Sequence, residues 1–313
     1  MVWRFIVPQD PPQSPHPCPN PPTPAPNPPI RAPMPHLSRI LIYPIKSLDP
    51  CPVPTATIAP GGSLGGDRRW AMVDGRPSAR QTPQSPRSWV NGKREPQIQR
   101  LRCRFDGAIA PAGQPQDPDH PPRISVGWDA IDPDLTFDLV AGTSPFSQWL
   151  SQGLGYPVSL VENPDQGFPD DPVSPGPTLI SAASLDTVAQ WFPGQSVAAM
   201  RLRFRVNLEI AEVPPFWEDR LFGTEETVVP FQIGAVQVLG VNPCKRCVVP
   251  TRDPWTGTVD PDFKAQFKQR RLESLPPWTV ADRFRNPYRL SVNTRIPPSE
   301  AGKVLSLGDP VML

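Results

Sequence analysis

Histidine and long hydrophobic runs are scarce in this chain of 313 residues. It has three histidines, and His120 lies in an Asp/Pro-rich stretch that is typical of a loop. Because histidine is the commonest general base, this scarcity argues against an enzyme built on a Ser–His or Cys–His pair. No segment approaches the roughly 18–20 continuous apolar residues of a membrane helix. The apolar patch before Pro8 is too short for a secretory signal. We therefore expect a cytoplasmic protein without a membrane partner.

The chain also lacks an excess of charge of one sign and a set of cysteines that could pair as disulfides. The chain has 31 Lys and Arg against 30 Asp and Glu, a net charge of +1. Nucleic-acid partners usually require a clearly basic face, so none is expected. The five cysteines stand at 18, 51, 103, 244 and 247. An odd number with one close pair does not form a disulfide framework.

Proline, by contrast, is abundant, with 50 residues, and it dominates residues 1–36. Such a segment buries too little apolar surface to offset the entropy of ordering, so we expect a disordered or polyproline II tail. A proline-rich docking ligand is an alternative function for it. An unstructured extension, with Met34 opening the folded part, is the interpretation that we favour.

Short strands between turns are expected along the remaining chain, with a few helices, which predicts a β-dominated α+β fold. The expected strands are 40–43, 56–58, 69–73, 100–105, 157–161, 203–210, 231–241, 289–292 and 311–313. Alternation over 100–105 makes Cys103 a small core residue. Strict alternation over 203–210 places Arg205 and Asn207 together on the polar face of one strand.

Capping signals predict three helices. Ser144 followed by Pro145 begins the first, and Gly153 ends it. Ser184 caps the second, and residues 260–261 begin the third. A Pro/Gly/Asp-rich stretch over 163–177 marks a boundary, which gives domains at 37–162 and 163–313.

The Cys-Lys-Arg-Cys segment at 244–247 is the clearest chemical feature. Structural zinc and iron–sulfur clusters each require four ligands, and no second pair exists. A thioredoxin-like pair usually opens a helix, whereas Val-Val-Pro follows here. A plain pair of reduced cysteines stays open. Arg246 sits beside Cys247 and would favour its thiolate, a soft ligand suited to a soft or high-valent metal.

Four ordered motifs resemble the molybdenum-cofactor-binding MOSC family, which includes the mitochondrial amidoxime-reducing components and bacterial relatives. They are Tyr-Pro-Ile-Lys-Ser at 43–47, Gly-Asp-Arg-Arg-Trp at 66–70, Arg-Phe-Arg-Val-Asn at 203–207, and Pro-Cys-Lys-Arg-Cys at 243–247 with Thr-Arg-Asp-Pro-Trp-Thr-Gly after it. The likeness spans about residues 38–313. It implies a MOSC β-barrel with a smaller N-terminal β-barrel-like domain.

The resemblance implies that Cys247 is the molybdenum ligand and catalytic residue, and that Cys244 supports it. The expected residues for binding molybdopterin are Lys46, Ser47, Arg68, Ser181, Arg205, Asn207 and Arg246. Lys46 and Arg68 would hold the phosphate, because Lys supplies a point charge and Arg a planar fork. The sequence departs from the family at Val206, where many members have Pro. It also lacks the additional arginine that some members have upstream of 67–69, which would weaken phosphate binding.

The implied function is an oxidoreductase that reduces small N-hydroxylated compounds. No cysteines for a fused iron–sulfur domain follow the last motif, so electrons would come from a separate ferredoxin-, flavoprotein- or cytochrome-like protein. A sulfur-carrier or cofactor-carrier module is the alternative, and a β-barrel scaffold with an incidental cysteine pair is a third. The sulfurase domain that binds pyridoxal phosphate in some relatives has no counterpart here, so pyridoxal phosphate binding would be a family label only.

Overall fold

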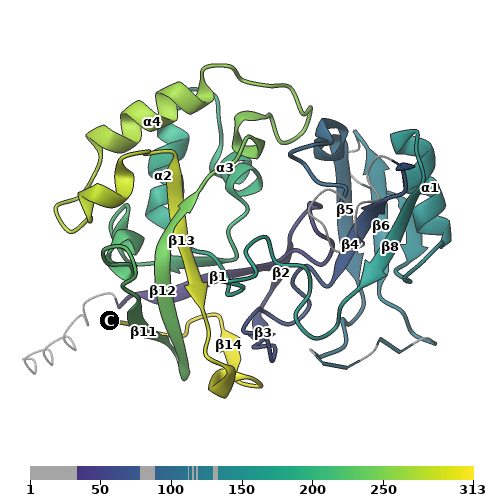
Figure 1. Ribbon diagram of the computed structural model, residues 1–313, viewed down its shortest axis with the longest axis horizontal. Helices are drawn as coiled ribbons and strands as arrows, with labels where there is room; N and C mark the ends of the chain where they lie inside the picture. The colour runs from purple at the N-terminus through teal and green to yellow at the C-terminus, as the bar shows by residue number, and fades with distance from the viewer. Residues whose placement is uncertain (1–33, 78–88, 112, 115, 118, 130–132) are drawn as a thin grey trace, which may run out of the picture. The chain divides into compact units, whose positions relative to one another are not determined.

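The computed structural model describes residues 34–313, with gaps at 78–88, 112, 115, 118 and 130–132 (Figure 1). Residues Met34–Leu313 form one compact unit. The expectation of a disordered tail over 1–36 falls almost wholly outside the described residues. Its last residue, His36, already begins strand β1.

An eight-stranded sheet is the largest element of the fold. In spatial order it contains β15 (Val311–Met312), β11 (Val229–Ile233), β12 (Val236–Lys245), β13 (Arg289–Arg295), β9 (Leu179–Ser181), β10 (Leu208–Ala211), β1 (His36–Ile42) and β2 (Cys51–Val53). Only the β9–β10 pair is parallel among these described strands. The region predicted as one strand over 231–241 is the β11–β12 hairpin, because Gly234 turns the chain with φ 55°.

The expected β-barrel is not closed by a strand ladder within the described residues. The first part of β1 instead meets the segment before β15 through an isolated bridge between His36 and Pro310. Leu37 also exchanges backbone hydrogen bonds with Gly308 and Asp309, of 2.8 and 2.9 Å. The fold is therefore a strand-rich α+β fold in which β1 of the main sheet contacts the segment before β15.

Three smaller sheets complete the strands. They are β4 (Trp70–Asp74) with β8 (Val158–Glu162), β5 (Leu101–Asp106) with β6 (Arg123–Trp128) and β7 (Leu135–Asp138), and β3 (Thr55–Thr57) with β14 (Val304–Ser306). The alternation predicted for β5 is confirmed, since Leu101 and Cys103 are buried in one cluster while Arg104 is exposed.

Four α-helices lie in the described residues: α1 (Pro145–Leu154), α2 (Ala182–Gln190), α3 (Val197–Phe204) and α4 (Phe263–Glu273). Short 3-10 turns are η2 (Pro96–Arg100), η3 (Trp217–Leu221), η4 (Val249–Thr251), η5 (Ala281–Phe284) and η6 (Pro298–Glu300). Helices α2 and α4 share one hydrophobic cluster with β13 (Figure 1).

Helix α1 begins as predicted, because Ser144 caps it by accepting from the Ser147 N–H. The predicted end at Gly153 is wrong. The helix continues to Leu154, and Gly155 ends it in the left-handed conformation with φ 78°. Gly153 instead allows close packing, since a Cβ there would lie 2.4 Å from Nε1 of Trp128.

Helix α2 begins earlier than its predicted cap. Ser181 is the residue before the helix, and Ser184 lies within its first turn. The Ser184 hydroxyl donates to Glu218 Oε2 at 2.9 Å and accepts from the Phe216 N–H at 2.6 Å. A tertiary partner, rather than the helix start, therefore explains this serine.

The predicted strand over 203–210 is wrong in its first half. Helix α3 runs to Phe204, capped by Ser196, which accepts from the Ala199 N–H. Arg205 ends the helix with φ 52° and ψ 52°, and only Leu208–Ala211 forms a strand. The apolar and polar residue types alternate here, but burial does not follow them, because Arg203, Asn207 and Glu209 are buried as well. The alternation therefore imitates a half-buried strand across a helix end and a strand start.

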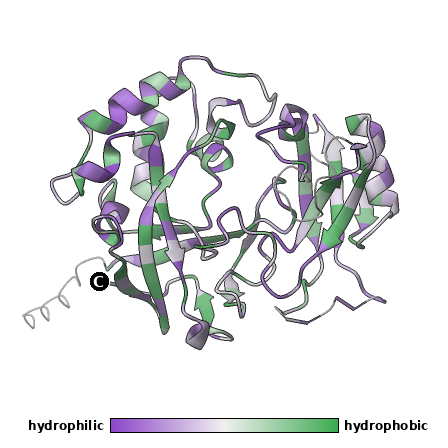
Figure 2. Cartoon of the chain, viewed as in Figure 1, coloured by the Kyte–Doolittle hydropathy of each residue, from purple (hydrophilic) through white to green (hydrophobic). Residues whose placement is uncertain are grey.

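Three hydrophobic clusters fill the interior. One is made of buried side chains that lie between positions 45 and 160 of the sequence, and a second of buried side chains between positions 180 and 290. The largest cluster joins Leu37 and Ile40 of β1 to Leu208 and Val292. Figure 2 shows hydrophobic residues concentrated in the strands, with both colours along α4. Because the largest cluster draws on both predicted domains, the boundary at 162–163 stays a prediction.

Candidate functional site

The cysteine segment lies where β12 ends and before the η4 turn. Cys244 and Cys247 are both free thiols of intermediate exposure. The Cys247 sulfur accepts a hydrogen bond from the Val249 N–H at 3.4 Å. The tight η4 turn therefore points a backbone donor at this sulfur, and no regular α-helix follows the pair.

Arg246 is directed at Cys244 rather than at Cys247. Its Nη1 lies 3.1 Å from the Cys244 sulfur, and its Nη2 donates to the Phe204 carbonyl. Positions 244 and 246 share one face of an extended chain, which explains the choice of cysteine. The backbone N–H of Arg246 bonds the Tyr288 carbonyl at 3.0 Å, which fixes this orientation. Arg246, which was expected to stabilise the Cys247 thiolate, is thus a hydrogen-bond partner of Cys244.

Tyr288 is a polar residue of this site that sequence reasoning missed. It is buried, and its hydroxyl has no hydrogen-bond partner among the described residues. Burial raises its pKa, the charges of Arg246 and Arg203 oppose this, and the Cys247 charge adds to it. The side chain therefore lies within electrostatic reach of Cys247. No sequence motif pointed to it, because it lies directly before β13, far from the cysteine segment along the chain.

Lys46 lies in the turn that follows β1, and its ammonium group is held inside the fold. Its Nζ donates to the Phe168 carbonyl at 2.9 Å and to Asp170 Oδ1 at 2.5 Å. Burial lowers its pKa, while Asp170 acts in the opposite direction. The ammonium group thus already has an anionic partner.

Arg68 occupies a strained position in the turn before β4, with φ 49°. Its guanidinium pairs with Asp67 and lies 3.8 Å from Asp170 Oδ2. Burial acts to lower its pKa, but Asp67 and Asp170 outweigh burial and raise it. Lys46 and Arg68 are therefore brought together on one carboxylate, as expected for two groups that share an anion.

Arg205 reaches the same place from the end of α3. Its Nη2 donates to the Leu48 carbonyl at 2.7 Å, and its guanidinium carbon lies 4.3 Å from the Tyr43 ring centroid. Arg68 lies over the same ring at 5.4 Å. Burial lowers the pKa of Arg205. Its left-handed backbone, rather than a strand face, directs it to Tyr43.

Asn207 has no hydrogen-bonding capacity left for a ligand. Its amide nitrogen donates to the Leu41 carbonyl and Asp67 Oδ1, at 3.0 and 3.2 Å. Its oxygen accepts from the N–H and the hydroxyl of Thr178, both at 3.2 Å. An amide makes four such bonds at most in the usual geometry. Asn207 therefore braces Asp67, which in turn holds Arg68.

The two predicted serines differ in their position. Ser47 directly follows Lys46 and adopts a left-handed backbone conformation with φ 76°. Ser181 is fully buried, and its hydroxyl donates to the Pro214 carbonyl at 3.2 Å. No hydrogen bond or ion pair in the described residues joins Ser181 to the other predicted site residues.

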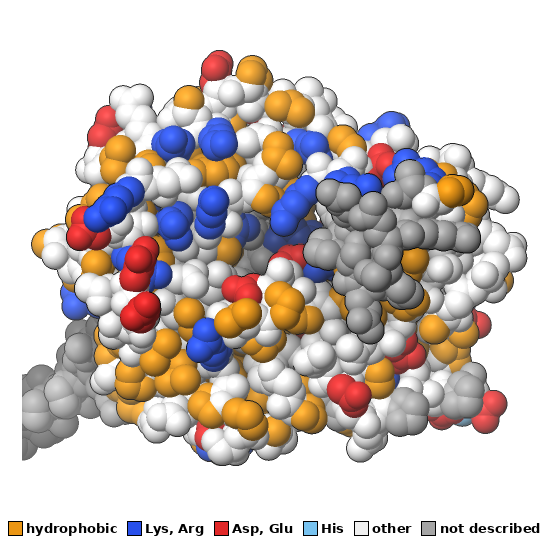
Figure 3. Space-filling model, in the orientation of Figure 1, with side chains coloured by type: hydrophobic (Ala, Val, Ile, Leu, Met, Phe, Trp, Pro, Cys, Tyr) orange, Lys and Arg blue, Asp and Glu red, His pale blue; other side chains and the backbone are white. Residues whose placement is uncertain are grey.

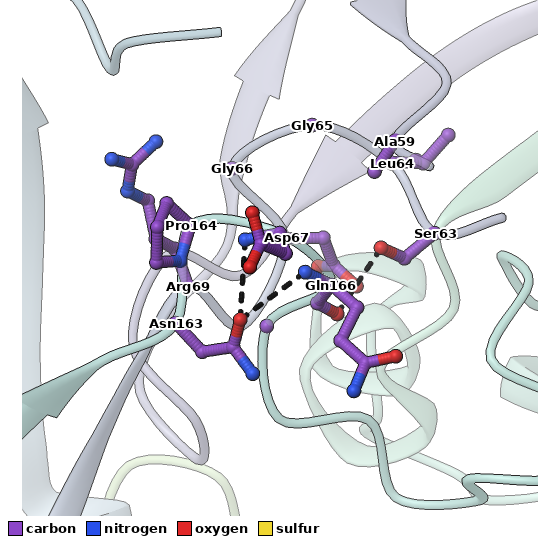
Figure 4. A pocket seen from close by; sticks show the side chains of 12 residues that line it. Ala59, Ser63, Leu64, Gly65, Gly66, Asp67, Arg69, Asn163, Pro164 and Gln166 are labelled. Carbon is purple, nitrogen blue, oxygen red and sulfur yellow. Dashed lines mark hydrogen bonds between the residues drawn. The ribbon is translucent and has the colours of Figure 1, made fainter. Parts of the chain in front are cut away.

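A small cavity of about 10 Å³ lies behind the Arg68 turn, between residues 63–69 and 163–167 (Figure 4). This volume holds about one water molecule. The Asn163 side chain accepts the backbone N–H groups of Asp165 and Gln166, and Ser63 donates to the Gln166 carbonyl. These bonds fix the loop that carries Asp170. A larger hollow of about 250 Å³ lies beside β1, β2 and Leu307. Neither the cysteine segment nor the cations around Tyr43 line it.

Basic side chains are numerous on the face shown in Figure 3, gathered in its upper half.

The described part of the chain contains no group of three or more His, Cys, Asp or Glu side chains that could hold a metal ion. Among the described helices, none combines the length and apolar character needed to cross a bilayer.

Comparison with known proteins gives one match, which covers the N-terminal part of the described chain. No curated protein matches the sequence. A family model described as the MOSC N-terminal beta barrel domain matches residues 34–117. The match contains Lys46, Ser47 and Arg68, whereas the cysteine segment lies beyond it. Residues 34–117 are therefore similar to the MOSC N-terminal beta barrel domain.

Proposed function

We propose that the protein is a molybdenum-cofactor-binding oxidoreductase with Cys247 as its protein ligand to the metal. The carrying observation is a continuous set of contacts from the cysteine segment to the cations of the N-terminal part. Arg246 donates a hydrogen bond to the Phe204 carbonyl. Arg205, which follows Phe204 in the sequence, packs its guanidinium over the Tyr43 ring, as Arg68 does. A soft sulfur ligand and an anion-binding cluster are therefore held in one connected framework.

The residues present fit the chemistry of molybdopterin, which carries a phosphate and a polar ring system. Lys46, Arg68 and Arg205 supply cations for the phosphate. Buried polar atoms without partners, Tyr288 Oη and Arg246 Nε, remain near Cys247 in the described residues. Buried polar groups are normally hydrogen-bonded, so such atoms favour a bound polar ligand. Asn207 fits as a brace and not as a ligand.

The bound group would supply the redox chemistry, while the chain would hold and orient it. The reaction implied by the family resemblance reduces an N-hydroxylated compound. Two electrons and two protons convert the N–OH group to N–H and release water. A separate ferredoxin-, flavoprotein- or cytochrome-like protein would deliver the electrons. Within the chain, Cys247 would be the metal ligand, and Arg246 would hold Cys244 out of the way of the metal.

Replacement of Cys247 tests the proposal most directly. We expect Cys247→Ser protein, made in a host that synthesises the cofactor, to lose at least about ninety per cent of its molybdenum, because a hydroxyl is a poor substitute for a soft thiolate. Elemental analysis of the purified protein is the measurement. Cys244→Ser is the matched control and should retain most of the metal. Wild-type protein free of molybdenum and pterin would refute the proposal.

A sulfur-carrier module is the second candidate, favoured by the Arg246 guanidinium beside the Cys244 sulfur. A cation there would stabilise a thiolate or persulfide. Turnover of an N-hydroxylated substrate with an artificial electron donor supports the first candidate. A stable persulfide found by mass spectrometry, without turnover, supports the second.

A further inference from the structure

Asp170 lies where the phosphate of a ligand would be bound. Its Oδ1 lies 2.5 Å from Lys46 Nζ, and its Oδ2 lies 3.8 Å from Arg68 Nε. The Lys46 side chain is 10% exposed, whereas that of Asp170 is 65% exposed. A carboxylate offers these cations the same anionic oxygens as a phosphate. An exposed anion thus sits at the mouth of an otherwise buried cationic pair.

We propose that Asp170 is an intramolecular competitor that occupies the anion site until a phosphate-bearing ligand displaces it. The inference rests on the anion site of the proposed function and adds its regulation. Two anions close together on one pair of cations repel each other. Binding of a phosphate therefore requires the carboxylate to leave.

The loop around Asp170 permits such a displacement without unfolding. Phe168 anchors the loop, because its N–H donates to the Arg68 carbonyl at 2.9 Å and its carbonyl accepts from Lys46 at 2.9 Å. Its ring also packs 5.0 Å from that of Trp89. The carboxylate itself is held by ion pairs alone among the described contacts. A rotation of one exposed side chain would free Lys46 while the anchor stays in place.

Electrostatics keep the competitor charged at neutral pH. Partial desolvation of the carboxylate acts to raise the pKa of Asp170, but the charges of Lys46 and Arg68 outweigh it and hold the pKa well below its usual range. Lys93 adds to this effect. The apparent affinity for a ligand equals its intrinsic affinity multiplied by the fraction of protein in the open form. Neutralising Asp170 should therefore tighten binding of any small oxyanion.

Titration calorimetry with inorganic phosphate tests the competition on the full chain. We expect Asp170→Asn to bind phosphate about fivefold more tightly than wild type, since a partly exposed ion pair contributes up to about 1 kcal/mol. Asp165→Asn is the matched control. It removes the same charge from the same loop, but its carboxylate forms no ion pair with Lys46 or Arg68 in the described structure. It should change the affinity less than twofold.

A second variant and a site check complete the experiment. Asp170→Ala removes the hydrogen-bonding amide as well and should tighten binding at least as much. Lys46→Ala in the Asp170→Asn background should abolish the gain. Unchanged, weaker or unmeasurable phosphate binding by both Asp170 variants overturns the inference. Tightened binding in protein that never acquires molybdenum would leave the inference intact and refute the proposed function.

Discussion

Tyr43 is the residue on which the arginines of the candidate site converge. Its ring is fully buried, with the guanidinium carbons of Arg205 and Arg68 at 4.3 and 5.4 Å from its centroid. Its hydroxyl donates to the Val206 carbonyl at 3.2 Å. Cation–π contacts contribute about 0.5–2 kcal/mol each, more where water is excluded. The aromatic face, rather than the hydroxyl, therefore orders the two arginines.

Replacement of the Tyr43 ring should weaken anion binding, whereas loss of the hydroxyl alone should not. We expect Tyr43→Leu to bind inorganic phosphate about tenfold more weakly, because both guanidinium groups lose their stacking surface. Tyr43→Phe keeps the face and should bind within about twofold of wild type. Calorimetry measures both, with circular dichroism to confirm folding. Equal affinities for the two variants would show that the ring does not position the arginines.

Residues of the site were predictable where a motif carries them, and not where tertiary contacts choose the partner. Lys46, Arg68 and Arg205 were expected together, and they meet through Tyr43 and Asp170. The role of Asp170 was missed because its Pro/Gly/Asp-rich surroundings indicate only a loop. The Ser63 hydrogen bond to the Gln166 carbonyl, which helps to place this loop, joins segments far apart in sequence.

At the scale of elements, the end of α3 decides where Arg205 points. Arg205 adopts the left-handed conformation at the helix C-terminus, with φ 52°. Glycine is the residue usually found there, because a side chain with a Cβ costs roughly 1 kcal/mol in this conformation. An arginine at this position indicates that its contacts with Tyr43 and Leu48 offset the strain.

Two substitutions at Arg205 separate the strain from the contacts. Arg205→Ala and Arg205→Gly both remove the guanidinium, so both should weaken phosphate binding to a similar degree. Only glycine relieves the backbone, and we expect its free energy of unfolding to exceed that of the alanine variant by about 1 kcal/mol. Urea denaturation measures the difference. An alanine variant as stable as the glycine variant would mean that the helix end is not strained.

Elements with strong local signals were predictable, and those defined by a change of conformation were not. The Ser144–Pro145 start of α1 and the alternation in β5 are local, and both are confirmed. The region 203–210 is predicted as one strand because apolar and polar residues alternate strictly along it. The capping Ser196, with Ala199 and Met200 buried after it, is the signal that would have revealed α3.

At the scale of the whole molecule, Glu218 ties the main sheet to the helical layer. Its Oε2 accepts from the Ser181 N–H of β9 at 3.2 Å and from the Ser184 hydroxyl of α2 at 2.9 Å. Its Oε1 is buried without a partner among the described residues. Burial, and then the charge of Asp219, raise its pKa to about 8. Asp219 itself pairs with Arg271 at 2.5 Å, so that cation is already engaged.

This carboxyl group should make the protein less stable as the pH rises. A carboxyl group whose folded pKa is raised binds its proton more tightly in the folded state, so its contribution is complete below the unfolded pKa of about 4.5 and is lost as the pH rises towards 8. We expect the free energy of unfolding to fall by about 2 kcal/mol between pH 6 and 8 because of Glu218. Glu218→Gln, which keeps the shape without the titration, should flatten this fall. Urea denaturation across the range measures it, with Glu226→Gln as an exposed control.

The carboxylates with lowered pKa values, such as Asp170 and Asp253, stay ionised throughout this window and cannot produce the slope. A Glu218→Gln variant that keeps the wild-type slope would show that the carboxyl group is ionised in the folded protein already at pH 6.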